Sequence, residues 1–188
     1  MKRSITIFTA LLLALIFTAP SGAELFDRGN GLIYDDILGI TWLQDANYSG
    51  STLTWDDAMS WADSLLFQGY SDWRLPSVDT SCIGSNCKGG EMGNLFHLYN
   101  VTADSPDIFT DVRSYMYWSA VDYDPDPTKA WRFHFNTGYQ GTSSKTYTRY
   151  AWAVRDGDSA LPVVPEPTGF ILFILGGISL AAQQLRKK

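Results

Sequence analysis

The sequence predicts an α+β fold, in which two helices come before most of the strands of an antiparallel sheet. In two early segments, apolar residues recur three and four positions apart, as on one face of a helix. In later segments, aromatic and β-branched residues alternate with polar ones, as in strands with one buried face. Helical segments followed by a run of strands are typical of an α+β domain.

The first elements are two short strands at 32–34 and 40–43, whose residues are mostly β-branched or aromatic. Asp35, Asp36 and Gly39 lie between them, and residues of these types favour turns. The two strands are therefore predicted to form a hairpin.

Two helices follow the hairpin. The first begins at Trp55, because Thr54 and Asp57 have the spacing of a capping box, and we expect Gly69 to end it. The second is predicted over 91–99. The first helix is expected to bury one face, formed by Trp55, Ala58, Met59, Ala62, Leu65 and Leu66, and the second a face formed by Met92, Leu95, Phe96 and Tyr99.

Strands make up the rest of the domain. They are predicted at 115–121, 130–136 and 150–154, and in the second of them Trp131, Phe133 and Phe135 alternate with polar residues. We expect the strands near the two ends of the domain to share one antiparallel sheet.

The N-terminus has the pattern of an export signal. Lys2 and Arg3 precede an apolar segment at 5–19, and small residues at Ser21 and Ala23 suit a signal peptidase. We therefore predict a helical signal peptide over 1–23, cleaved after Ala23. An N-terminal anchor that is not cleaved is the alternative.

The C-terminal segment, 165–188, contains Pro165, Glu166 and Pro167, an apolar run at 168–182, and basic residues at the end. This order resembles the PEP-CTERM sorting signal, which implies a transient stay in the inner membrane and recognition by an exosortase. A plain membrane anchor is the alternative, although the run is shorter than the roughly 20 residues of a spanning helix. Either way we expect a short hydrophobic helix here, and an exported protein that is anchored or released to the cell surface.

Between these segments, residues 24–164 form one strongly acidic domain. Five of the 14 basic residues and one of the 20 acidic residues lie outside it, which leaves nine against 19, a net charge of minus ten. A field of this sign repels phosphate backbones, so nucleic acid is excluded as a partner. All seven Trp residues lie in the domain, and the sequence does not divide them between the core and a sugar-binding surface.

Cys82 and Cys87 are the two cysteines of the chain. In an exported protein we expect them to form a disulfide that closes a small loop. A redox or catalytic pair is the alternative, but no His lies nearby in sequence to lower the pKa of a thiol.

An acidic loop provides the candidate ligand site. Asp122, Asp124 and Asp126 occupy alternate positions, from which three carboxylates can converge on a cation such as Ca²⁺. The alternative is a solvated turn between strands, favoured by Pro125 and Pro127.

The sequence contains no catalytic motif of the common hydrolases, nucleotide-binding proteins or metalloenzymes. His97 falls in a predicted helix and His134 in a predicted strand, where each is expected to be a structural or surface residue. No catalytic residue is therefore assigned.

A series of short motifs runs through the domain: 31–35 (GLIYD), 39–42 (GITW), 69–76 (GYSDWRLP), 117–120 (YWSA), 130–133 (AWRF) and 153–155 (AVR). In this order they resemble the Lcl C-terminal domain family, over about residues 30–156. The resemblance implies a fold similar to C-type-lectin-like and formylglycine-generating-enzyme-like domains, and it brings no shared catalytic residues. The family is named for the C-terminal domain of a collagen-like bacterial adhesin, but this chain has no Gly-X-Y repeat.

The most specific motif consists of Asp72, Trp73, Arg74, Leu75 and Pro76. We expect a structural role, with Trp73 and Leu75 in the core and Arg74 paired with Asp72 or Asp111. Trp118, Trp131 and Arg155 are assigned to the same structural set, and acids of the opening hairpin are expected to hold Arg155.

Two functions of different classes follow. The first is a non-catalytic binding module that is exported to the cell surface or to a polysaccharide or biofilm matrix. Its candidate ligand is a glycan. The alternative is a secreted enzyme on a lectin-like scaffold, either a hydrolase or a relative of the formylglycine-generating enzyme.

Overall fold

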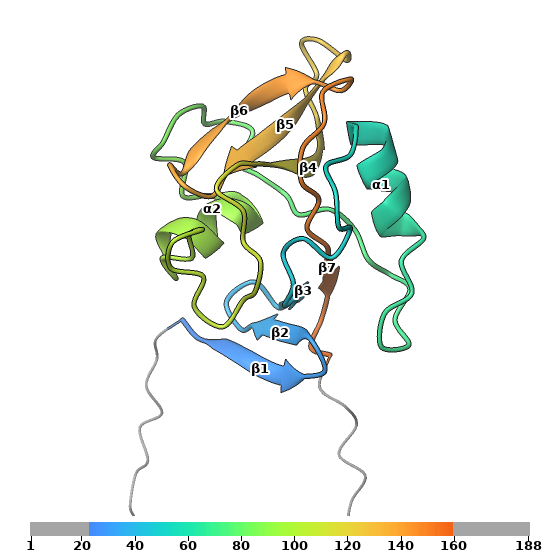
Figure 1. Ribbon diagram of the computed structural model, residues 1–188. Coiled ribbons are helices and arrows are strands. Elements are labelled where there is room, and N and C mark those ends of the chain that lie inside the picture. The colour runs from blue at the N-terminus through green and yellow to red at the C-terminus, as the bar shows by residue number, and fades with distance from the viewer. Residues whose placement is uncertain (1–22, 160–188) are drawn as a thin grey trace, which may run out of the picture.

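The computed structural model describes residues 23–159, which fold into seven strands and two short helices (Figure 1). The predicted signal peptide, except Ala23, and the predicted sorting segment with Pro165, Glu166 and Pro167 lie outside the described residues. The elements are β1 (Leu25–Gly29), β2 (Leu32–Asp35), β3 (Ile40–Leu43), α1 (Trp55–Asp63), α2 (Gly90–His97), β4 (Met116–Asp122), β5 (Lys129–His134), β6 (Tyr139–Ser144) and β7 (Val154–Asp156).

The strands form two antiparallel sheets, so the α+β prediction is confirmed and the prediction of one sheet is wrong. One sheet has the order β1-β2-β3-β7, and it does join the strands nearest the two ends of the domain. The other has the order β4-β5-β6. Figure 1 shows the two sheets at opposite ends of the molecule, with α1 and α2 on its two sides. The described chain begins and ends near β1, far from β5 and β6.

The segment before β7 connects the two sheets. Tyr150 lies beside β4, where it donates its amide to Met116 and accepts the amide of Trp118. Four residues later, Val154 pairs with Trp42 of β3. Only 154–156 is therefore a strand, instead of the predicted 150–154, because the chain passes from one sheet to the other within this stretch.

Helix α1 begins as predicted and ends early. The amide of Asp57 donates to the Thr54 hydroxyl, which caps the first turn. The last helical residue is Asp63, because the chain then turns back on itself: Phe67 and Tyr70 exchange both backbone hydrogen bonds around Gly69, whose φ is 83°. Gly69 thus forms a tight turn and does not cap the helix, and Leu66 is exposed.

Helix α2 also ends before its predicted limit. It stops at His97, and Tyr99 lies beyond it, where the phenol donates a 2.8 Å hydrogen bond to the buried carboxylate of Asp35. At its start, Gly90 has a φ of 71°, and a Cβ there would lie 2.5 Å from the Val78 Cα. The start and the end of α2 are therefore both set by contacts with residues distant in sequence.

Tryptophan fills the interior, and the exposed aromatic residues of the described chain are tyrosines. The main core is built around Trp42 and Trp152, and a smaller one lies between α1 and β4 around Trp118. Each tryptophan is buried except Trp61, which is half-buried. The large aromatic residues on the surface are Tyr48, Tyr115, Tyr139 and Tyr147. Within 23–159 no helix has the length and apolar character to cross a membrane, and the predicted apolar run at 168–182 lies outside these residues.

Candidate functional site

A structural clamp between Arg74 and α2 holds the most specific motif, residues 72–76, in place. Trp73 and Leu75 are buried, and the backbone of Arg74 exchanges two hydrogen bonds with Val154 beside β7. The guanidinium forms a fork with both oxygens of Glu91, at 2.9 and 2.6 Å, and also contacts Asp156 at 2.6 Å. The predicted partners Asp72 and Asp111 were therefore wrong. The fork raises the pKa of Arg74 and so keeps it charged.

A second clamp holds Arg155. Its guanidinium donates to both oxygens of Asp72, at 2.8 and 2.9 Å, and to the Ser159 hydroxyl, and it stacks 4.0 Å from the ring centre of Tyr70. Acids of the opening hairpin do not hold it, because β7 lies at the opposite edge of β3 from β2. The pairing lowers the pKa of Asp72. These two clamps fix the motif to the last strand.

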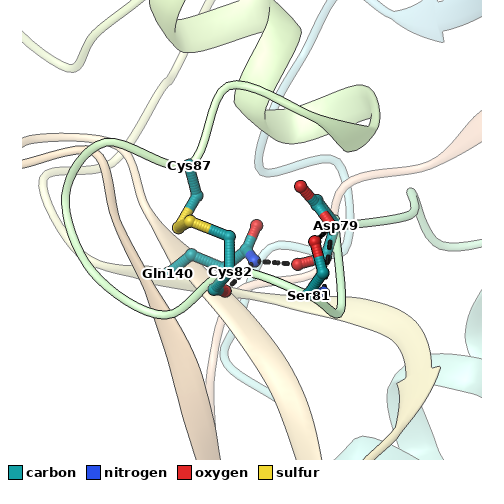
Figure 2. The surroundings of a disulfide bond; sticks show 5 residues. All are labelled: Asp79, Ser81, Cys82, Cys87 and Gln140. Atoms are coloured by element: carbon teal, nitrogen blue, oxygen red, sulfur yellow. Dashed lines mark hydrogen bonds between the residues drawn. A yellow bond between two sulfur atoms is a disulfide. The ribbon is translucent and has the colours of Figure 1, made fainter.

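Cys82 and Cys87 form a disulfide whose Cα atoms are 5.6 Å apart, as predicted. Figure 2 shows Gln140 of β6 reaching into the loop, where its side-chain amide donates to the carbonyls of Asp79 and Cys82 at 2.6 and 2.7 Å. The backbone of Gln140 also exchanges two hydrogen bonds with Gly84. The disulfide loop therefore covers part of the outer edge of β6, and neither cysteine is a free thiol.

The acidic loop is held by lysines. Asp122 pairs with Lys145, whose ammonium also lies 4.1 Å from the ring centre of Trp55. Asp126 accepts a hydrogen bond from the Thr128 hydroxyl and pairs with Lys129 at 3.0 Å, contacts that lower its pKa to about 2. Among residues 23–159, no three His, Cys, Asp or Glu side chains are grouped so that they could hold a metal ion. The structure thus does not bring Asp122, Asp124 and Asp126 together as calcium ligands.

A hollow of about 270 Å3 lies beside this loop. Tyr123 and Trp131 form part of its wall, with their ring centres 5.7 Å apart and nearly perpendicular. Trp131 is only 3 % exposed, so the ring serves mainly as core, in agreement with its structural assignment.

A different surface, which the sequence did not single out, gathers cations and aromatic rings. We call it the arginine–tyrosine surface, and it consists of Tyr115, Arg132, Tyr139, Tyr147 and Arg149. Arg149 lies 5.5 Å from the ring centre of Tyr115 and 5.3 Å from that of Tyr147. Arg132 lies 5.5 Å from the ring centre of Tyr139. Three of these residues belong to loops or to the segment after β6, and two to β5 and β6.

Strand alternation explains how Arg132 reaches this surface. In β5 the side chains of Trp131 and Phe133 are buried in the main core, so Arg132 between them points to the other face. Its cross-strand neighbour on β6 is Gly141, and a Cβ on Gly141 would lie 2.9 Å from the Tyr139 ring. The glycine therefore makes room for the tyrosine ring that stacks on Arg132.

Within residues 23–159, Arg132 and Arg149 have no carboxylate partner. Six of the nine basic side chains of the domain form ion pairs, namely Arg28, Arg74, Arg113, Lys129, Lys145 and Arg155. Among the described residues, no carboxylate pairs with Arg132 or Arg149, and the two instead share the hydroxyl of Ser143, at 2.8 and 3.4 Å. Arg132 Nη1 and Arg149 Nε are buried without a hydrogen-bond partner. Burial and the charge of Arg149 lower the pKa of Arg132.

Of the two histidines, His134 lies next to this surface and His97 does not. His134 belongs to the same face of β5 as Arg132, and its ring centre is 6.2 Å from that of Tyr115. His97 ends α2, beside Lys88 and Asn94. Burial lowers the pKa of both imidazoles, and Arg132 adds to the effect at His134 as Lys88 does at His97. Alternation in 130–136 was the available sequence signal for Arg132 and His134 sharing a face.

The fold and these contacts define a small α+β domain that is held together by two arginine clamps and a disulfide loop and that carries the arginine–tyrosine surface. Residues 31–155 match the family described as the Lcl C-terminal domain. The match covers most of the chain, and the protein therefore belongs to the Lcl C-terminal domain family, as its motifs predicted. Strand β1 lies outside the matched residues. No curated protein matches the chain.

Proposed function

We propose that this protein is an exported, non-catalytic binding module that holds an anionic extracellular polysaccharide on the arginine–tyrosine surface. The observation that carries the proposal is the absence of any carboxylate partner for Arg132 and Arg149 among the described residues, in a domain with 19 acidic side chains. A guanidinium forms paired hydrogen bonds with a carboxylate or sulfate, and neither Arg132 nor Arg149 has such a partner among the described residues.

The tyrosines favour a sugar as the carrier of that anion. A tyrosine ring offers a rigid apolar face and a polar hydroxyl, which suits a ligand with both apolar C–H groups and hydroxyls. Tyr139 and Tyr147 are 39 % and 58 % exposed and flank the two arginines. Nucleic acid also carries anions, but a net charge of minus ten opposes a long phosphate backbone.

The proposed route to the ligand is export through the signal peptide 1–23 and sorting through the PEP-CTERM-like segment 165–188, with an exosortase as the processing partner. The proposed place of action is the cell surface or the surrounding matrix. The arginine–tyrosine surface involves β5 and β6, at the end of the molecule away from where the described chain begins and ends (Figure 1). This placement suits a domain tethered at its C-terminus. We also propose that the fold is related to C-type-lectin-like domains, as the family resemblance implies.

The test uses dextran sulfate and unmodified dextran, which share a backbone and differ in charge. The full-length protein is expected to bind dextran sulfate and polygalacturonate but not dextran, and to bind less tightly in about 0.5 M than in about 0.05 M salt. In the double variant Arg132→Gln/Arg149→Gln, the Kd should rise at least about tenfold, since each hydrogen bond to a charged group contributes about 1.5–3 kcal/mol.

The matched control is Lys88→Gln, which removes an exposed cation that takes no part in the cation–aromatic contacts of the surface and should leave the Kd unchanged. Equal binding by the wild type and the arginine double variant would refute the proposal. The polysaccharide should keep its length during incubation, and shortened chains would favour the alternative of a secreted hydrolase. A tag at the C-terminus that is lost only in cells with an exosortase would support the sorting route.

A further inference from the structure

We propose that His134 is a third cationic group of this binding site and that its protonation strengthens the binding of anions as the pH falls. The inference rests on the proposed function, since it concerns the same surface. It adds a residue outside the arginine–tyrosine surface as defined above, and it makes binding depend on pH.

The position of His134 carries the inference. It lies two residues after Arg132 on the same face of β5 and pairs across the sheet with Tyr139 on β6 and Met116 on β4. The ring of Tyr115 neighbours both His134 and Arg149, 6.2 Å from the imidazole centre and 5.5 Å from the guanidinium carbon. An anion that contacts Arg132 and Tyr139 therefore lies within reach of the imidazole as well.

The surroundings of His134 favour the neutral form of the free imidazole. The groups that face it are Arg132 on its own strand, Tyr139 and Met116 on the neighbouring strands, and Tyr115 with Arg149 behind it. None of them is a carboxylate, and burial together with Arg132 lowers the pKa of His134. Its Nδ1 accepts a 3.2 Å hydrogen bond from the backbone amide of exposed Asn136, which leaves the proton of the neutral ring on Nε2. Protonation displaces this hydrogen bond, and the exposed amide can then bond to water.

A bound anion reverses the preference of the imidazole for its neutral form. It favours the charged imidazole, so the pKa of His134 should rise when the ligand binds. By linkage, each unit of that rise makes binding about tenfold tighter at a pH below both pKa values than at a pH above both. We expect a decrease in Kd of about three- to tenfold between pH 8 and pH 5.5, the range in which a histidine titrates.

The experiment measures the Kd of the full-length protein for dextran sulfate across this range, because its sulfate esters keep their charge and any pH dependence belongs to the protein. His134→Gln should bind as the wild type does at high pH and should lose the tightening at low pH. His97→Gln is the matched control and should keep it. The chain has two histidines, so the imidazole proton signals can be assigned from these two variants and titrated by NMR with and without dextran sulfate.

The NMR titration keeps the test decisive even if His134→Gln folds poorly, since it uses the wild type. A rise in the pKa of His134 with ligand, and none at His97, is the expected result. Binding that is equally tight at both pH values, or an unmoved pKa of His134, overturns the role of the histidine and leaves the arginine surface standing. Failure to bind dextran sulfate at any pH overturns both proposals.

Discussion

The clamp between Arg74 and Glu91 should contribute much of the stability of the domain, and Glu91→Gln tests this. The substitution keeps the shape of the side chain and removes its charge. Glu91 accepts two hydrogen bonds from the guanidinium and one, at 2.7 Å, from the amide of Ser77, and its side chain is 11 % exposed. Breaking a largely buried pair leaves a charge without its partner. We expect the free energy of unfolding to fall by about 2–3 kcal/mol, below the range for full burial because Arg74 is 34 % exposed.

The same arginine provides an internal comparison. Asp156 contacts Arg74 at the same 2.6 Å, but its side chain is 80 % exposed, so Asp156→Asn should cost less than about 0.5 kcal/mol. Denaturation in guanidinium chloride, followed by tryptophan fluorescence, measures both variants. With a slope of about 3–4 kcal/mol/M, Glu91→Gln should lower the midpoint by about 0.5–1 M. We expect burial, and not contact distance, to determine how much stability each variant loses. An equal loss in the free energy of unfolding for the two variants would therefore refute this prediction.

Two further predictions concern the disulfide and a buried carboxylate. Replacing both Cys82 and Cys87 by Ser should lower the free energy of unfolding by about 2 kcal/mol, the loop-closure value for so small a loop, and a wild type that loses nothing on reduction by dithiothreitol would contradict this. Burial raises the pKa of Asp35, so the stability it contributes is present below its ordinary pKa of 3.8 and is lost as the pH rises through the folded pKa. Urea titrations above about pH 4 should therefore show the wild type losing stability relative to Asp35→Asn, and a constant difference would be the contrary result.

Local patterns in the sequence predicted the elements whose stability is local. The Thr54 cap, the hairpin of β2 and β3, and the alternation in β5 all depend on neighbouring residues, and each is confirmed. Strand β6 was missed because Gln, Gly and Ser are weak strand formers, and its pairing with β5 provides the stability that its own residues do not. The ends of α1 and α2 were misplaced because distant contacts set them, as with Tyr99 and Asp35.

The partners of the arginines could not be predicted from sequence. Arg74 and Asp156 are 82 positions apart, and Arg155 and Asp72 are 83 apart, so 19 acids offered many equivalent choices. The arginine–tyrosine surface is assembled from separate segments around 115, 132, 139 and 149, and no spacing rule connects them. Its strongest property is that no described carboxylate pairs with its arginines, which only the folded arrangement can reveal.

The lack of a described carboxylate partner for Arg132 and Arg149 has an energetic consequence for binding. Two guanidinium groups near one another repel, and burial together with this repulsion lowers the pKa of Arg132. Contacts with Tyr139, Tyr115 and Tyr147 offset part of the cost, but a cation–π contact leaves the charge in place. A carboxylate of the domain in the same position would have neutralised the pair and removed its affinity for an external anion. The aromatic contacts thus stabilise both arginines in the folded domain and keep them available to a ligand, which a salt bridge would not.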